Sequence, residues 1–246
     1  MMSAMLYGFL SGFALLLGAV AGLRFKLPKT VIALIMAYGS GVLMSALSID
    51  LMNDAFEISE DVAIISISFV LGAVVFVLGD AFIDSQGGDK RKSIHPPNEV
   101  AASAGKAILL GTLLDGVPES LVMGTTLTAG ETGGIVMVVA VFLSNFPEGI
   151  SGTIAMKNSG MSKAKILGIW SLMLLITMVC TAFGYRFLGD ASAAFKAASM
   201  AFASGAILAM LCDTMLPEAY KDGGKFVGVV SVLGFLTAFL LSKLWG

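Results

Sequence analysis

Residues 62–83, VAIISISFVLGAVVFVLGDAFI, form an apolar stretch that contains a single ionisable side chain, Asp80. A helix of about 20 mostly apolar residues is long enough to cross the hydrocarbon core of a membrane. Runs of this length are uncommon in soluble domains, where charged residues interrupt the apolar pattern. This stretch therefore predicts a transmembrane helix, and it sets the class of the whole chain.

The rest of the chain has a similar composition. Its 246 residues are 57% apolar and 13% charged, whereas an ordinary soluble domain is about 25% charged. We predict an all-α integral membrane protein, formed by a single transmembrane domain over residues 1–246, with no nucleic acid as a partner. The apolar runs indicate eight spans, at residues 3–23, 31–52, 62–83, 104–128, 133–156, 165–187, 196–219 and 226–245.

Basic residues concentrate in every second linker, which predicts the topology. Linkers that face the cytoplasm carry an excess of Lys and Arg, so we expect linkers one, three, five and seven to be cytoplasmic. Both termini then lie outside, residues 84–103 form a cytoplasmic loop, and the chain is a multi-pass protein of the plasma membrane. The basic residues of these linkers and their flanks are Arg24, Lys26, Lys29, Lys90, Arg91, Lys92, Lys106, Lys157, Lys163, Lys165, Lys221 and Lys225.

The sequence also contains an internal repeat. A shift of 164 residues aligns residues 40–56 with residues 204–220, which relates span two to span seven. These spans are separated by an odd number of steps, so the copies run in opposite directions, as in many secondary transporters. A weaker match at a shift of 29 relates spans four and five. We predict an inverted repeat in which spans 1–3 are related to spans 6–8 around central spans 4 and 5.

Two short motifs place acidic side chains inside the central spans. Span four contains residues 114–120, LDGVPES, and span five contains residues 143–149, LSNFPEG. An ionisable side chain at a helix centre costs about 2.5–3.5 kcal/mol on insertion. A functional or structural role must therefore offset this cost for the acids of the two motifs. In both motifs a proline precedes the glutamate, and proline inside a helix removes a backbone hydrogen bond and bends the helix. Paired interrupted helices indicate a transporter binding site.

The chemistry of the two motifs points to a cation. Asp115 and Glu119 are four residues apart, as are Ser144 and Glu148, so each pair shares a helix face. Clustered carboxylates resist ionisation unless a counter-charge is present, and a divalent metal ion with oxygen ligands supplies one. We predict that the cargo is a divalent ion such as Zn, Mn or Fe, with no organic cofactor. The predicted ligands are Asp115, Glu119, Ser144, Asn145, Glu148 and Asp213.

Further acids lie near the ends of spans two and seven. Asp50, Asn53, Asp54 and Glu57 recur at helical spacing and form one stripe at the outer end of span two. Glu218 lies at the cytoplasmic end of span seven. One interpretation is a pathway for cations, formed by Asp50, Asp54 and Glu218. The alternative is that these acids are solvated near the headgroups.

The two motifs resemble those of the ZRT/IRT-like (ZIP) family of metal transporters. In that family span four carries HNxPEG and span five carries Gln or His, an acid, and then xPE or xPH; the matching residues here are 115–120 and 144–149. The eight spans, the external termini and the long linker after span three extend the resemblance over nearly the whole chain. It implies an eight-helix transporter fold with a divalent-metal site, often binuclear, in spans four and five.

The chain departs from the family motif at the positions of the strongest ligands. Asp115 stands where the motif has histidine, Gly116 where it has asparagine, and Ser144 and Asn145 replace stronger ligands. Span six, residues 165–187, lacks the acid that completes a second metal site. Imidazole favours zinc, so its absence shifts the expected preference toward harder ions.

Three alternatives stay open from the residues alone. The Pro-Glu motifs can be structural kinks with neutral, hydrogen-bonded acids, or relay groups in a proton-coupled carrier of another small solute. Gly79 and Asp80 suggest an intramembrane aspartyl protease, but the Tyr-Asp pair and the Pro-Ala-Leu run of such proteases do not occur here. We therefore expect a carrier and not an enzyme, embedded in lipid and able to pair as a homodimer.

Overall fold

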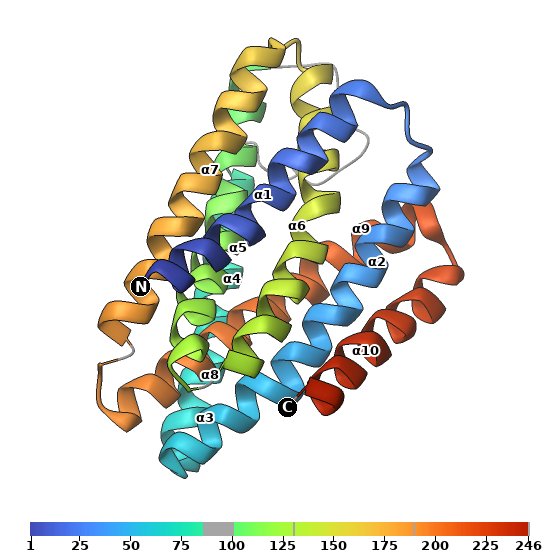
Figure 1. Cartoon of the computed structure of the whole chain (residues 1–246). Coiled ribbons are helices and arrows are strands. Elements are labelled where there is room, and N and C mark those ends of the chain that lie inside the picture. The colour runs from blue at the N-terminus through green and yellow to red at the C-terminus, as the bar shows by residue number, and fades with distance from the viewer. Residues whose placement is uncertain (86–100, 130, 189, 246) are drawn as a thin grey trace.

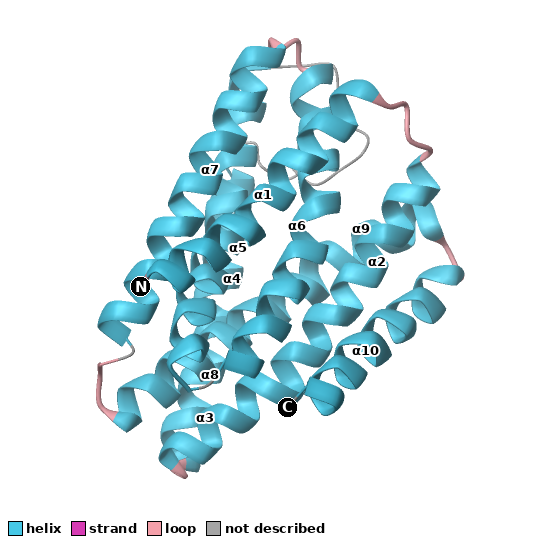
Figure 2. Ribbon diagram, viewed as in Figure 1, coloured by secondary structure: helices cyan, strands magenta, loops and turns pink. Residues whose placement is uncertain are grey.

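Figure 1 shows a computed structural model that describes residues 1–85, 101–129, 131–188 and 190–245. Within these residues every regular element is a helix, as the colouring of Figure 2 shows. The helices lie side by side in one bundle. In chain order they are α1 (Met2–Arg24), α2 (Lys29–Ser45), α3 (Met52–Ser59), α4 (Val62–Ile83), α5 (Ala101–Ala129), α6 (Glu131–Asn158), α7 (Lys163–Phe183), α8 (Ala193–Met210), α9 (Leu216–Gly223) and α10 (Phe226–Trp245).

Several of these helices have the length and composition of membrane spans. In the part of the chain whose side chains the structure describes, seven helical segments are long and apolar enough to cross a bilayer. The long helix that is not among them is α5, which carries the Asp115–Glu119 motif. The helices α4 and α10 expose large apolar side chains along most of their length, as expected of surfaces that face lipid. The chain is thus a multi-pass membrane protein.

In the part of the chain that the structure describes, three complete π-helical segments continue the helices that precede them. They are η1 (Ala46–Leu51) after α2, η3 (Gly184–Leu188) after α7, and η4 (Leu211–Met215) after α8. Because η1 and η4 lead directly into α3 and α9, the second and seventh spans extend to Ser59 and Gly223. The predicted end of span two at residue 52 is therefore wrong, whereas Asn53, Asp54 and Glu57 lie in a helix, as their spacing indicated.

The turn between α3 and α4 explains why the fourth helix starts where its apolar run begins. Asp61 caps α4, because its Oδ1 accepts hydrogen bonds from the backbone N–H groups of Ala63 and Ile64 at 3.0 and 3.1 Å. Glu60 ends α3 with a φ of 52°, the left-handed conformation that stops a helix. The predicted span at 62–83 matches α4. The predicted loop at 84–103 falls mostly on residues 86–100, outside the described residues.

The helices pack in two groups. The first group consists of α1, α5, α6 and α7, where α1 packs on α6 and α7, and α5 packs on α6 and α7. The second group consists of α2, α3, α4, α8, α9 and α10, where α2 packs on α10 and α9, and α8 packs on α4 and α3. The two groups meet mainly where α2 touches α6 and where α8 touches α5. The central helices α5 and α6 thus lie at the boundary.

Reciprocal glycines bring α2 and α10 into close contact. A Cβ atom added to Gly41 would lie 1.9 Å from the carbonyl oxygen of Ser231. One added to Gly234 would lie 2.1 Å from the carbonyl oxygen of Tyr38. Both distances are far below any real Cβ contact, so only glycine permits this crossing. Small residues of this kind let membrane helices approach backbone to backbone.

The helices α4 and α8 cross in the same way. A Cβ atom added to Gly72 would lie 1.8 Å from the carbonyl oxygen of Phe202, and one added to Gly205 would lie 1.9 Å from that of Phe69. A shift of 164 residues moves Gly41 onto Gly205, and it moves the bounds of α3 onto those of α9. The register predicted by the shift of 164 residues therefore matches these helix bounds and this crossing glycine.

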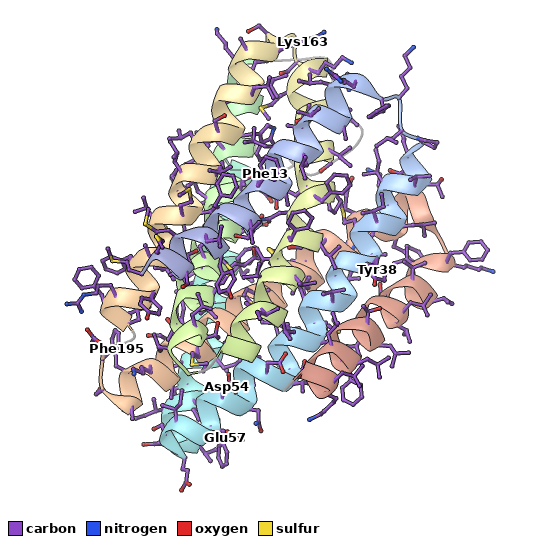
Figure 3. The ribbon with its side chains drawn as sticks, viewed as in Figure 1. Phe13, Tyr38, Asp54, Glu57, Lys163 and Phe195 are labelled. Atoms are coloured by element: carbon purple, nitrogen blue, oxygen red, sulfur yellow. The ribbon has the colours of Figure 1, made fainter. Side chains whose placement is uncertain are left out.

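Opposite charges gather at opposite ends of the bundle. Figure 3 shows Lys163 at one end, and Asp54 and Glu57 at the other. The start of α2 and the end of α9 share the basic end, because Thr30 Oγ1 donates to the carbonyl oxygen of Asp222 at 3.2 Å. The linkers α1–α2, α6–α7 and α9–α10 and their flanks carry exposed basic residues, which are Arg24, Lys26, Lys29, Lys157, Lys163, Lys165, Lys221 and Lys225.

Candidate functional site

The first half of the candidate site is on α5, where Pro118 interrupts the backbone hydrogen bonds. Asp115 and Glu119 are 3% and 2% exposed, so both acids are buried as predicted. Ser120 is also buried, and its Oγ donates to the carbonyl oxygen of Gly116 at 2.5 Å. Two carboxyl groups on one face of a bent helix thus lie inside the bundle.

Space remains beside this helix where the ZIP motif has a larger residue. A Cβ atom added to Gly116 would have one neighbour within 4 Å, the Cε atom of Met173 at 3.9 Å. Unlike the glycines at the helix crossings, Gly116 is not required by close packing. The residue instead leaves α5 without a side chain one position after Asp115.

The second half is on α6, which contains Pro147 inside the helix. Ser144 and Asn145 are 3% and 5% exposed, and Glu148 is half-buried. Ser144 Oγ donates to the carbonyl oxygen of Val141 at 3.0 Å. Because α5 packs on α6, the two kinked motifs belong to neighbouring helices.

Asn145 makes a contact that the sequence did not suggest. Its Nδ2 donates to the carbonyl oxygen of Ser11, on α1, at 3.1 Å, and this hydrogen bond is buried. The residues are 134 positions apart, and nothing in the pattern around Ser11 marks it as a partner. Asn145 therefore ties α6 to α1, while its Oδ1 atom keeps the lone pairs that a ligand needs.

The carbonyl oxygen that Pro147 deprives of its helical partner is that of Leu143. This oxygen lies against α2, since a Cβ atom added to Gly39 would be 2.8 Å from it. The structure thus places the freed oxygen at the boundary between the two helix groups. A glycine at position 39 is what allows α2 to approach this part of α6.

An apolar cluster separates the motifs from the acidic end of the bundle. Val122 and Met123 follow the α5 motif, and residues 136–141 precede the α6 motif; these segments pack with apolar side chains of α2 and α8. The cluster includes Leu43 and Ile207, which are buried.

The acids predicted for the pathway lie apart from the motifs along the chain. Asp50 is in η1, where it accepts a hydrogen bond from Ser242 Oγ at 2.5 Å, and Asp54 is in α3; both are half-buried. Asp213, in η4, is exposed, and Glu218, in α9, is half-buried. Both of these residues belong to the repeat copy of the η1–α3 segment.

The structure does not assemble a ready cluster of acids. Among the residues that it describes, no group of three or more His, Cys, Asp or Glu side chains is arranged to hold a metal ion. The predicted ligand set stays a prediction.

The prolines stand at different distances from the glycine crossings of the two central helices. The α1–α6 crossing uses Gly18 and Gly149, and the crossing of α5 with α7 and η3 uses Gly124 and Gly184. Pro147 lies two residues before its crossing glycine, whereas Pro118 lies six residues before. The two motifs are therefore offset by about one helical turn with respect to these crossings.

Comparison with known proteins adds no identification: no family model matches the chain, and no curated protein matches it.

Proposed function

We propose that this protein is a secondary transporter that carries divalent metal ions across the membrane. The observation that carries the proposal is the pairing of two neighbouring proline-kinked helices, α5 and α6, whose polar motifs are buried. Burying carboxyl groups in a membrane protein is expensive, and such groups mark ion or proton pathways. Glu119 and Glu148 are the central ligands of the bound ion, assisted by Asp115, Ser144 and Asn145.

The proposed architecture is that of the ZIP family, with eight spans and an inverted repeat. Its support is the repeated register: α3 and α9 share their bounds after a shift of 164 residues, and the α2–α10 crossing uses the same glycine geometry as the α4–α8 crossing. In this arrangement spans 1–3 are related to spans 6–8. The helix α5 is span four, and it brings the seven spans recognised by length and composition to a total of eight. The repeat units rock about the central site to give alternating access.

The ion that we propose is harder than zinc, such as Mn²⁺ or Fe²⁺. The motifs on α5 and α6 offer carboxylate, hydroxyl and amide oxygens and no imidazole or thiolate, and oxygen-only sites suit harder ions. Asp50 and Asp54 attract cations at the outer end, while Asp213 and Glu218 guide them at the cytoplasmic end. The protein lies in the plasma membrane with both termini on the extracellular side. We propose that two copies pair as a homodimer.

The direct test is calorimetric binding of Mn²⁺ to the purified protein and to Glu119→Gln and Glu148→Gln. Each substitution keeps the shape of the side chain and removes one negative charge, so each is expected to weaken binding at least about 10-fold, equivalent to about 1.4 kcal/mol. Glu60→Gln, at the exposed end of α3, is the matched control and is expected to bind like the original protein.

Binding by both Gln variants equal to that of the original protein would overturn the metal site and leave the Pro-Glu motifs as structural kinks. A different outcome is that no ion binds, but a solute gradient acidifies the lumen of proteoliposomes that contain the original protein and not of those that contain Glu119→Gln. The chain is then a proton-coupled carrier of another solute. Cleavage of a model peptide in detergent would instead support a protease.

A further inference from the structure

The linker between α1 and α2 lies beside the end of α9. Thr30 Oγ1, at the start of α2, donates to the carbonyl oxygen of Asp222 at 3.2 Å across a separation of 192 residues. A Cβ atom added to Gly223 would lie 3.4 Å from the Cβ atom of Ala33, so the end of α9 packs on the first turns of α2. The α1–α2 linker and the turn into α10 therefore form one corner at the same end of the bundle (Figure 1).

Positive charge dominates this corner, which we define as residues 24–30 and 218–226 and call the basic corner. It contains five basic residues and two acids, Glu218 and Asp222. The acids are half-buried, whereas the basic residues are all exposed. A surface of this kind attracts phosphate groups through its electrostatic field. The basic residues are Arg24, Lys26, Lys29, Lys221 and Lys225.

Exposed aromatic side chains lie in the same corner as the basic residues. Phe25 is 62% exposed, Tyr220 is 59% exposed and Phe226 is 71% exposed. Tyrosine is enriched at the boundary between the hydrocarbon core and water, and phenylalanine rings insert among the acyl chains next to that boundary. The aromatic rings thus indicate that the basic corner lies at the level of the lipid headgroups.

An apolar track leads away from the basic corner along α10. Its side chains recur every three or four residues, so they share one face of the helix. The track begins at the residue next to Lys225, so a charged group at this lysine lies at the start of an apolar surface. This order matches the headgroup and the acyl chain of a phospholipid, whereas a free phosphate ion would use only the charged part. The exposed residues of the track are Phe226, Val229, Leu233, Leu236 and Leu240.

We propose that the basic corner binds an anionic phospholipid, with the phosphate among Lys26, Lys221 and Lys225 and an acyl chain along the apolar track of α10. Basic clusters beside a membrane helix recognise anionic headgroups through this kind of charge attraction. The proposal does not rest on the metal site, because no residue of the α5 and α6 motifs takes part in it.

The linker between α6 and α7 offers a comparison within the same chain. It lies at the basic end of the bundle, since Figure 3 shows Lys163 there. Residues 157–168 contain no aromatic residue, and they belong to one linker and its flanks instead of two. The three exposed lysines of this linker are Lys157, Lys163 and Lys165.

Two glycines give matched positions for a fluorescent label. Gly228 is three residues after Lys225, and Gly168 is three residues after Lys165; both are exposed. Among the described residues nothing lies within 4 Å of a Cβ atom at either position, so a cysteine fits there. The label is attached to Gly228→Cys or to Gly168→Cys in a background with Cys180→Ser and Cys212→Ser.

Quenching of the label by spin-labelled lipid measures the binding. The labelled proteins are placed in phosphatidylcholine nanodiscs that contain a small fraction of spin-labelled phosphatidylglycerol, which is anionic, or of spin-labelled phosphatidylcholine, which has no net charge. The ratio of quenching by the two lipids reports the preference for the anionic one. We expect this ratio to be at least about 2-fold larger at Gly228→Cys than at Gly168→Cys, because charge attraction and the apolar track act together there. Equal ratios at the two positions would overturn the proposal.

Removal of charge assigns the preference to particular lysines. The triple variant Lys26→Gln, Lys221→Gln and Lys225→Gln is expected to lower the ratio at Gly228→Cys to the value at Gly168→Cys. An unchanged ratio would show that these lysines do not hold the headgroup, and the proposal would fail.

A second triple variant controls for the total charge of the protein. Lys157→Gln, Lys163→Gln and Lys165→Gln remove the same number of positive charges from the same end of the bundle, and they are expected to leave the ratio at Gly228→Cys unchanged. An equal loss from both triple variants would overturn the proposal and leave only a general attraction between basic surfaces and anionic lipid.

A competing anion separates a lipid headgroup from a free phosphate ion. We expect sodium phosphate to lower the ratio at Gly228→Cys no more than sodium chloride at the same ionic strength. A selective loss in phosphate would show that the corner takes the free ion, and the lipid proposal would be wrong. Calorimetric binding of Mn²⁺ is expected to be the same for the original protein and the first triple variant, so a failure here and a failure of the proposed transport site are distinguishable.

Discussion

At the scale of single residues, the donor on Asn145 explains why an amide suits this position. Its Nδ2 is one of two polar groups in a buried hydrogen bond to Ser11 on α1. A carboxylate of the same size has no hydrogen to donate and would face the carbonyl oxygen with its own lone pairs. The hydrogen bond to α1, as well as any bound ion, therefore favours an asparagine at position 145.

Asn145→Asp is expected to lower the free energy of unfolding by about 1–3 kcal/mol, because it leaves buried groups without their hydrogen bond. The measurement is the melting curve in detergent with a chelator present, so that metal binding plays no part. Asn158→Asp, at the exposed end of the same helix, is the control. Equal stability of the two variants would show that the Asn145 bond contributes little.

Asp115→His is expected to shift the ion preference toward zinc. The change supplies an imidazole next to Glu119, and imidazole suits zinc better than a carboxylate does. The measurement is competition between Zn²⁺ and Mn²⁺ for the original protein and the variant at one fixed pH, because protonation of the ligands alters the apparent affinity. An unchanged Zn²⁺/Mn²⁺ ratio would mean that Asp115 is not among the ligands.

At the scale of the elements, glycines let α4 and α8 pack backbone to backbone. Gly72→Ala would place a methyl group on the backbone of α8, so we expect the two helices to separate and the melting temperature to fall. Gly228→Ala is the matched control. Nothing lies within 4 Å of a Cβ atom there, and alanine in a helix is favoured over glycine by about 1 kcal/mol. A rise for both variants would contradict the contact.

Much of the helix pattern was predictable because it depends on local sequence. The span at 62–83 begins at an aspartate cap and ends with its apolar run, and the structure has the same bounds. The continuation of span two through residues 53–59 was predictable only in part: the helical spacing of Asn53, Asp54 and Glu57 indicated it, whereas the end of the apolar run at residue 52 did not. The position at which this helix ends depends on its packing on α8. The π-helical segments likewise depend on tertiary packing.

The same division holds for the candidate site. Burial of Asp115 and Glu119 followed from their place inside apolar spans, and the structure confirms it. The contacts of Asn145 with α1 and of Asp50 with α10 join residues that are 134 and 192 positions apart. No local pattern encodes such separations, so these partners could only be found in three dimensions.

At the scale of the whole molecule, the separation of charge between the two ends predicts the orientation. Arg91→Cys, in a background without Cys180 and Cys212, is expected to resist an impermeant thiol reagent applied to intact cells, because the positive-inside rule predicts that residue 91, which lies outside the described residues, is cytoplasmic. Asp190→Cys, in the exposed linker after η3, is expected to react readily. Ready labelling at position 91 with none at position 190 would reverse the topology.

The burial of acids in α5 has a consequence for how the protein is made. When the ribosome delivers this helix to the translocon, Asp115 and Glu119 each add about 2.5–3.5 kcal/mol to the free energy of lateral release into lipid. A nascent chain that stops just after Ala129 should therefore fail to integrate α5, and its C-terminal end should stay on the side of synthesis. Synthesis through Asn158 supplies α6, against which the polar face of α5 can be sheltered during assembly, so the two helices leave the translocon together.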